Sequence, residues 1–390
     1  MGEPPRGDGM KRGAVVLVFL LLLMVNLPAA EAWWAEGHRL MTYEAIKLVP
    51  EEWRPFFEHY AYFLNETCNW PDTVFKSEDP LEEPRHYYDL EIPPDQRTYE
   101  DGALPYAVEN FTREMADALA RGDWYEALVN AGRVAHYVED AHQPYHATVN
   151  YNPMGKHGLA DSLVEKHWKE LDIRPGEPQF IENLTAYMFD IIVDSNRKVA
   201  RLNATLIGDP DDPSDDRDWS DDLRDLISEQ ASRAITAVAS VWLTAIEMSG
   251  ASPPDLSESY SLSVEITSPD NATSLLRGSA EVVDGFGIPV DADVRVYLGE
   301  TEVTQVRRAG LGRYGFVIEA DQLQLYAGED VELRVVASRE GYGQAEGLKV
   351  IHVAPAKRAR EAEVGLSPLV LAALAGVLLI LALALILRRR

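Results

Sequence analysis

The sequence has 390 residues, enough for two ordinary domains and additional segments. Its formal net charge is −28 at pH 7, which argues against a nucleic-acid binder that works through a basic groove. Cys68 is the only cysteine, so no disulfide can form within the chain, and the core or bound metal must stabilise the fold.

The first residues have the pattern of a secretory signal peptide. Arg6, Lys11 and Arg12 precede a long apolar run, and Ala30-Glu31-Ala32 fits a small-x-small cleavage site. We therefore expect residues 1–32 to be a signal peptide. Its removal would place a free amine at Trp33.

Residues 33–250 are expected to form an all-α domain. Apolar side chains recur at helical spacing in four stretches, namely residues 40–49, 111–119, 181–200 and 227–246, and Gly250 ends the last. Strand-like alternation is scarce in this part of the chain. Aspartates crowd a Pro-containing loop at residues 209–222, where the charge pattern favours a solvated loop over a calcium site.

The rest of the chain predicts a β-domain and a membrane helix. A linker at 251–256 precedes four stretches of period two, at residues 261–267, 293–298, 314–318 and 331–336. They predict a small Ig-like β-sandwich over 257–355 that serves as a spacer. After a juxtamembrane segment at 356–365, the apolar run 366–387 is long enough to span a bilayer, and 388–390 would be a cytoplasmic tail. A sorting tail that is later removed is the alternative interpretation of that run.

One stretch of the helical domain concentrates side chains that bind metals: His136-Tyr-Val-Glu-Asp140-Ala-His-Gln-Pro-Tyr-His146. His136 and Asp140 are four residues apart, so on a helix they lie one turn apart on the same face and can reach one ion. Pro144 bends or ends that helix, so His146 can serve a second ion. Taken alone, the stretch fits buried polar groups of a core equally well.

Four further stretches of the same domain supply metal-type donors. His38 follows the expected mature terminus, Asp72 is expected at a turn, and His86 is expected to head an extended segment. His157 and Asp161 repeat the four-residue spacing on another expected helix. Eight such donors in one helical domain predict a multi-zinc site, because zinc is bound by His nitrogen and Asp oxygen in sets of four.

In order and spacing, these motifs resemble the trinuclear-zinc superfamily that holds bacterial phospholipase C and the fungal and plant single-strand nucleases. The motifs are Trp33-Trp-Ala-Glu-Gly-His38, Pro71-Asp72, His86-Tyr-Tyr-Asp89, His136-x-x-x-Asp140-x-x-x-Pro144-x-His146 and His157-x-x-x-Asp161. The resemblance covers residues 33–250 and nothing in the β-domain or the C-terminal run.

The resemblance implies three zinc ions and a set of ligands for each. The implied ligands are Asp72, His86, His136 and Asp140 for the first ion, Asp140, His38 and the amine and carbonyl of Trp33 for the second, and His146, His157 and Asp161 for the third. Glu165, one turn beyond Asp161, is the reserve candidate for the last carboxylate. Asp72 is also the implied catalytic base. Tyr87 and Asp89 are candidates for substrate binding, although packing alone would equally account for Tyr87.

These expectations combine into a predicted activity. Two zinc ions that share Asp140 can hold a bridging water with a pKa near about 7, and a third can stabilise charge on a phosphoryl oxygen. We expect an exported, single-pass membrane protein that hydrolyses phosphodiesters outside the cell and resembles phospholipase C. No protein partner is implied.

Two alternatives stay open at this stage. A single-strand nuclease fits the N-terminal motif, but the Gly-Gly-Asn stretch and the Asn-Leu-His-x-x-Trp-Asp form of the last ligand pair are absent. The second alternative is a non-enzymatic surface protein that holds structural zinc.

Overall fold

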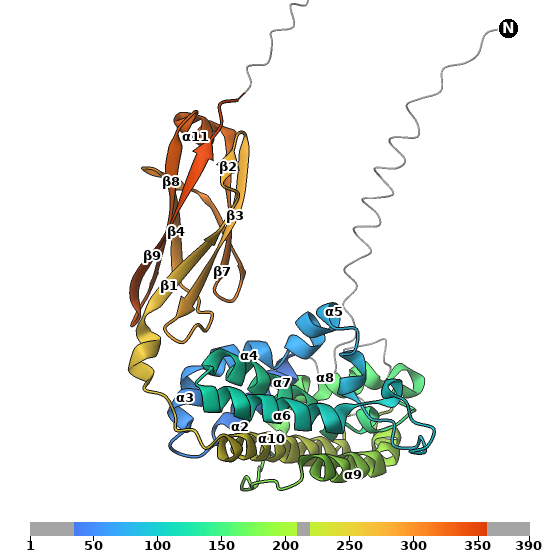
Figure 1. Ribbon diagram of the computed structural model, residues 1–390. Coiled ribbons are helices and arrows are strands. Elements are labelled where there is room, and N and C mark those ends of the chain that lie inside the picture. Colours follow the sequence, from blue (N-terminus) through green and yellow to red (C-terminus); the bar gives the residue numbers. More distant parts are fainter. Residues whose placement is uncertain (1–34, 209–218, 357–390) are drawn as a thin grey trace, which may run out of the picture. The chain divides into compact units, whose positions relative to one another are not determined.

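The computed structural model describes residues 35–208 and 219–356 (Figure 1). The expected signal peptide, Trp33, most of the aspartate-rich loop and the expected membrane helix at 366–387 lie outside the described residues. Within the described ranges, no helix is both long and apolar enough to cross a bilayer. The chain divides into two compact units: one extends to Leu262 and also takes in Val283–Val290, and the other comprises Ser263–Val282 and the chain from Asp291.

The first unit is helical, as the apolar periodicity predicted. Its α-helices are α2 (Ala35–Ile46), α3 (Arg54–His59), α4 (Ala61–Thr67), α5 (Lys76–Glu78), α6 (Leu104–Arg121), α7 (Trp124–His142), α8 (His157–His167), α9 (Leu184–Thr205) and α10 (Asp221–Ser249). A π-helical turn spans Pro71–Phe75, and short 3-10 helices span Glu83–His86, Tyr99–Asp101, Pro144–Ala147, Pro153–Gly155, Trp168–Glu170 and Leu256–Tyr260.

Helices α6, α7 and α10 lie side by side and form the centre of this unit (Figure 1). All three bury long apolar stripes, and the Trp242 indole of α10 donates to the Ala131 carbonyl of α7 at 2.9 Å. The Ser195 hydroxyl of α9 donates to the Ala141 carbonyl at 2.6 Å. Helix α7 is thus held by both α9 and α10, which fixes the donors that it carries.

Helix α7 has identifiable start and stop signals. The Asp123 carboxylate accepts the backbone N–H of Glu126 at 3.2 Å and caps the N-terminus. Gln143 precedes Pro144 and has an extended conformation, because a residue before proline is disfavoured in the α region. Pro144 then begins a 3-10 turn that carries His146, so the chain changes direction between the two groups of donors, as predicted.

The segment after α8 is tied along α10 by a ladder of hydroxyl groups. Backbone N–H groups of Asp172, Arg174, Gly176, Gln179 and Ile181 donate to Ser228, Ser232, Thr236, Ser240 and Thr244 at 2.8–3.1 Å. These hydroxyls recur every four residues on α10, and the last four donate in turn to the carbonyl four residues earlier. Each hydroxyl in this ladder therefore serves a backbone N–H that forms no helix or sheet bond.

The second unit contains two β-sheets. Its strands are β1 (Leu262–Thr267), β2 (Asn271–Ala272), β3 (Leu275–Asp284), β4 (Asp293–Leu298), β5 (Thr301–Val303), β6 (Gln305–Gly310), β7 (Arg313–Glu319), β8 (Asp330–Arg339) and β9 (Gly343–Val353). One sheet has the order β1-β3-β7-β6 and the other β2-β9-β8-β4-β5. Short helices α11 (Ala320–Leu323) and Gln324–Tyr326 follow β7.

The two sheets share one apolar core. Leu276 and Phe316 come from the first sheet and Val296, Leu333 and Ile351 from the second, and they pack in one buried cluster. Side chains alternate between buried and exposed along β7 and β8, as period-two patterning requires. The predicted strands at 261–267, 293–298, 314–318 and 331–336 coincide with β1, β4, β7 and β8.

Candidate metal centre

The predicted donors that the structure describes converge on one region of the helical unit. The donors form three groups, and within each group the ligand atoms lie within 4.8 Å of one another. The groups are His38, His136 and Asp140; Asp72, His86 and His136; and His146, His157 and Asp161. All eight predicted ligands other than Trp33 belong to these groups. They come from α2, the π-helical turn, the 3-10 helices Glu83–His86 and Pro144–Ala147, α7 and α8.

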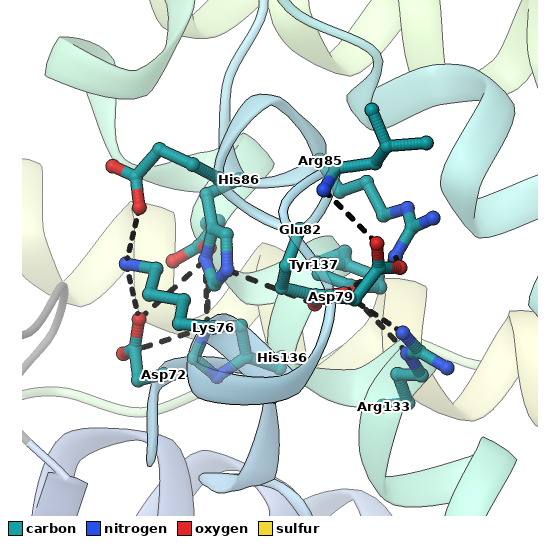
Figure 2. Close-up of polar contacts among 12 residues, drawn as sticks. Asp72, Lys76, Asp79, Glu82, Arg85, His86, Arg133, His136 and Tyr137 are labelled. Carbon is teal, nitrogen blue, oxygen red and sulfur yellow. Dashed lines mark hydrogen bonds and ion pairs between the residues drawn. The ribbon is translucent and has the colours of Figure 1, made fainter. Parts of the chain in front are cut away.

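The first predicted set surrounds the Asp140 atom Oδ2. That oxygen lies 2.9 Å from Nδ1 of His86 and 3.3 Å from Nε2 of His136, and these two nitrogens are 3.1 Å apart. Asp72 completes the set at 3.6 Å from His136 and 3.7 Å from His86. Figure 2 shows Asp72, His86 and His136 facing one another. Asp72 lies in a π-helical turn, not in the simple turn expected, and such turns often occur at functional sites.

The other oxygen of Asp140 faces a different direction. Its Oδ1 lies 3.7 Å from Nε2 of His38 and accepts no hydrogen bond from any described residue, although Asp140 is fully buried. A buried carboxylate oxygen without a hydrogen bond carries a large desolvation cost unless a cation compensates it. The two oxygens of Asp140 are thus placed between two groups of donors, which fits a bridging ligand.

The third group lies around His146 and His157. Their Nε2 atoms are 3.1 Å apart, and Nε2 of His157 is 3.1 Å from Oδ2 of Asp161. The Gln143 amide donates to the other oxygen of Asp161 at 2.6 Å. Glu165, the reserve candidate, is exposed and belongs to none of the three groups, so the geometry favours Asp161.

The outward nitrogens of four imidazoles are fixed by hydrogen-bond acceptors. Nδ1 of His136, His146 and His157 donates to the carbonyls of Cys68, His86 and Tyr151 at 2.6–2.7 Å. Nδ1 of His38 lies 2.6 Å from Oε2 of Glu139. Because these acceptors take the proton on Nδ1, the lone pair of each Nε2 is directed toward the neighbouring donors.

The donor set fits zinc in spacing, and four of its five histidines fit it in charge state. Ligands of a tetrahedral zinc at about 2.0–2.1 Å stand roughly 3.3 Å apart, close to the separations given above. Burial lowers the pKa of His38, His86 and His136 well below the ordinary range and that of His146 to about 4, which favours the neutral imidazoles that bind metals. Burial also lowers the pKa of His157, but Asp161 outweighs it and brings that pKa to about 9.

A cavity of about 610 Å³ opens onto these donors. Its lining includes His86, His146 and His157 together with both predicted substrate residues, Tyr87 and Asp89. Burial raises the pKa of Asp89 to about 6 and, with the charge of Asp89, that of Tyr87 to about 12. The volume lies within the range of small-ligand sites, so the donors are accessible to a substrate.

Lys76 contributes a cation to the same cavity. Its ammonium lies 2.8 Å from Oδ1 of Asp72 and 3.2 Å from Glu83 (Figure 2). Burial lowers the pKa of Lys76, but these two carboxylates outweigh it and hold the pKa above its ordinary value, so the side chain stays charged. Sequence reasoning missed this residue, although its spacing of four from Asp72 was the available signal.

A buried ionic network lies next to the His86 ring. The Glu82 carboxylate is fully buried, pairs with Arg85 at 2.6 Å and Arg133 at 2.8 Å, and accepts from the Tyr137 hydroxyl (Figure 2). Its Oε1 lies 3.9 Å from Nε2 of His86. This network and Glu139 were not predicted, because nothing in the sequence marks which carboxylates will be buried.

Comparison with known proteins places this site in a family context. Residues 33–159 match the family model of the S1/P1 nucleases. Over these residues the match confirms the resemblance inferred from the motifs. The matched segment holds every predicted ligand except Asp161, which lies two residues beyond it.

Two solved structures show similarity at low identity. The alpha-toxin of Clostridium perfringens aligns with 11% identity and a TM-score of 0.40, covering 83% of this chain and 98% of that one. The alpha-toxin of Clostridium absonum aligns with 13% identity and a TM-score of 0.40, covering 83% and 93%. No curated protein matches the chain.

Proposed function

We propose that this protein is a zinc-dependent phosphodiester hydrolase. The observation that carries the proposal is the convergence of eight His and Asp donors into three groups, three of whose histidines line an open cavity, with the two oxygens of Asp140 facing different donor groups. Bound zinc would lower the pKa of a coordinated water to about 7 and withdraw charge from a phosphoryl oxygen. The family match supports the same class of reaction.

The chain's own residues would bind and orient the substrate. Lys76 presents a permanent positive charge to the cavity and can pair with a phosphoryl oxygen. Asp72 lies between Lys76 and His136 and is our candidate for the carboxylate that orients the attacking water. Asp89 and Tyr87 line the wall where the group attached to the phosphate would lie.

The exposed apolar side chains of the loop between His146 and His157, called the rim below, favour a phospholipid as the substrate. Three apolar side chains of the loop between His146 and His157 are exposed to solvent: Val149 by 45%, Tyr151 by 61% and Met154 by 74%. Val149 and Tyr151 also line the cavity. Exposed apolar side chains gathered beside a binding site are typical of surfaces that contact lipids or other apolar partners.

The nuclease is the second candidate, and the family match favours it. Tyr87, Tyr145 and Tyr151 line the cavity and could stack against bases. The alternative of a purely structural zinc protein is disfavoured by the same cavity, because structural sites are closed to solvent whereas His86, His146 and His157 reach an open one.

Hydrolysis assays separate these candidates. The purified protein is offered phosphatidylcholine vesicles, a water-soluble phosphodiester and denatured DNA, each with and without a zinc chelator. We expect chelator-sensitive hydrolysis of the lipid and the soluble ester. Cleavage of DNA alone would favour the nuclease over the phospholipid hydrolase. No turnover of any substrate would contradict the proposal.

A paired variant tests the role of the rim. Replacing Met154 with serine, alone and together with Tyr151, should reduce hydrolysis of vesicles at least several-fold, and the single variant should leave the soluble ester almost unchanged. Equal losses on both substrates would remove the rim from lipid recognition. Export, the membrane anchor and extracellular location stay part of the proposal, since they rest on sequence segments outside the described residues.

A further inference from the structure

Glu139 is a buried acid beside the candidate bridging ligand. It has no exposed surface and precedes Asp140 on α7. Successive side chains on a helix point about 100° apart, so the two neighbouring carboxylates face different surroundings. Asp140 faces the donor groups, whereas Glu139 faces α2.

Both oxygens of Glu139 contact side chains of α2. Oε2 lies 2.6 Å from Nδ1 of His38, and the Thr42 hydroxyl donates to Oε1 at 3.0 Å. His38 and Thr42 are four residues apart and so lie on one face of α2. With Nδ1 of His38 as the donor, each oxygen of Glu139 accepts one hydrogen bond.

This contact differs from those of the other imidazoles. His136, His146 and His157 donate from Nδ1 to neutral backbone carbonyls, but His38 has a carboxylate as its partner. A carboxylate is a stronger acceptor and makes the opposite ring nitrogen a better ligand. That nitrogen, Nε2, is the atom that lies near the Asp140 oxygen without a hydrogen bond.

We propose that Glu139 is a positioning residue that fixes the tautomer and orientation of His38 and strengthens metal binding where His38 and Asp140 meet. The inference rests on the proposed function, because it concerns one of the zinc sites named there. A buried acid without such a role is costly, since removing a carboxylate from water is repaid only by good pairing. The pairing here is with a candidate ligand and its neighbour on α2.

Zinc binding by matched variants tests the proposal. In Glu139→Gln one acceptor oxygen remains, whereas Glu139→Leu keeps much of the volume and no acceptor. Asp284→Asn is the control, because that buried acid binds the Tyr60 hydroxyl at 2.7 Å and is not among the donors. Zinc per chain and the affinity of the weakest zinc are measured by competition with a chelator.

We expect the weakest zinc to lose affinity in the order wild type, Gln, Leu, by about 10- to 100-fold for the leucine variant, while Asp284→Asn keeps the wild-type affinity. Equal affinities in wild type and Glu139→Leu would overturn the inference and leave the proposed function standing. A wild-type protein that binds no zinc would overturn both.

A measurement on the wild type does not depend on whether a variant folds. Nitrogen-15 NMR of the histidines in the zinc-loaded protein should show His38 with its proton on Nδ1 and the metal on Nε2. The opposite tautomer would refute the role of Glu139.

Discussion

Individual imidazole rings show how the site is organised at the level of the residue. Of the five predicted histidine ligands, four have their Nδ1 fixed by an acceptor, and only His86 presents Nδ1 to the other donors. The acceptors are three backbone carbonyls and one carboxylate, so the orientation of the ligands depends on how the main chain packs around them.

Lys76 provides a test of charge in the cavity. Lys76→Met removes the ammonium but keeps an unbranched apolar side chain of similar length. A charge-assisted hydrogen bond contributes about 1.5–3 kcal/mol, so kcat/KM for a phosphodiester should fall about 10- to 100-fold. Steady-state kinetics measure this, and zinc content should stay unchanged. Unaltered kinetics would show that Lys76 does not contact the substrate.

Asp89 should make stability depend on pH. Its pKa in the folded protein is about 6, above its ordinary value of 3.8, because burial disfavours the charged form. The folded state therefore holds the proton more tightly than the unfolded state, and stability falls as pH rises from about 4 to 6. Asp89→Asn lacks this loss, so its stability relative to wild type should increase across that window and stay level above it.

Urea unfolding of wild type and Asp89→Asn between pH 4 and pH 8 measures the difference. Other titrating groups are common to both proteins and cancel in the comparison. A difference in the free energy of unfolding that does not change with pH would contradict the raised pKa.

At the scale of the element, the close approach of α4 and α7 sets the position of His136. A Cβ on Gly132 of α7 would lie 2.8 Å from the backbone carbon of Thr67 and in collision with its hydroxyl. Cys68, which follows the last residue of α4, offers the carbonyl that accepts from Nδ1 of His136, one turn along α7 from Gly132. Glycine at 132 therefore allows the contact that orients a candidate ligand.

Gly132→Ala should separate the two helices. Overpacking of this kind costs about 1–3 kcal/mol, and the shift should also weaken zinc binding. Gly158→Ala on α8 is the matched control, because a Cβ there meets nothing within 4 Å. Thermal unfolding and zinc affinity of both variants check the prediction. Equal behaviour of the two would show that α7 can move without disturbing His136.

The hydroxyl ladder of α10 predicts a second effect at this scale. Thr244 is fully buried and accepts the backbone N–H of Ile181 at 2.9 Å, so Thr244→Val leaves that buried N–H without its acceptor. The free energy of unfolding should fall by about 1–3 kcal/mol. Thr244→Ser keeps the hydroxyl and should lose less. If serine and valine are equally destabilising, the lost methyl contacts and not the ladder would account for the effect.

For the whole molecule, helical geometry explains which parts of the site were predictable. His136 and Asp140, like His157 and Asp161, were paired correctly because a spacing of four fixes proximity on a helix. That Asp72 and His38 approach them depends on tertiary packing, so it was expected only through the resemblance to a family. Glu139 gave no signal, because its neighbour Asp140 has the same chemistry and only packing separates their roles.

In the β-unit, too, features that depend on tertiary packing could not be predicted from the sequence. Strand β9 was not predicted, because Gly347 is buried while Leu348 and Val350 are exposed, which reverses the usual alternation. Strand β3 carries Gly278 on Phe316, where a side chain would collide with the ring. In both strands, packing against a neighbour and not local preference decides the residue.

The central claim is that the converging donors bind zinc and that this zinc enables phosphodiester hydrolysis. The most direct test is to remove metal from the purified protein and measure hydrolysis as zinc is added back in known equivalents. We predict no hydrolysis without zinc and a rise that saturates near three zinc ions per chain. Full hydrolysis by the metal-free protein, or zinc binding with no hydrolysis of any phosphodiester, would contradict it.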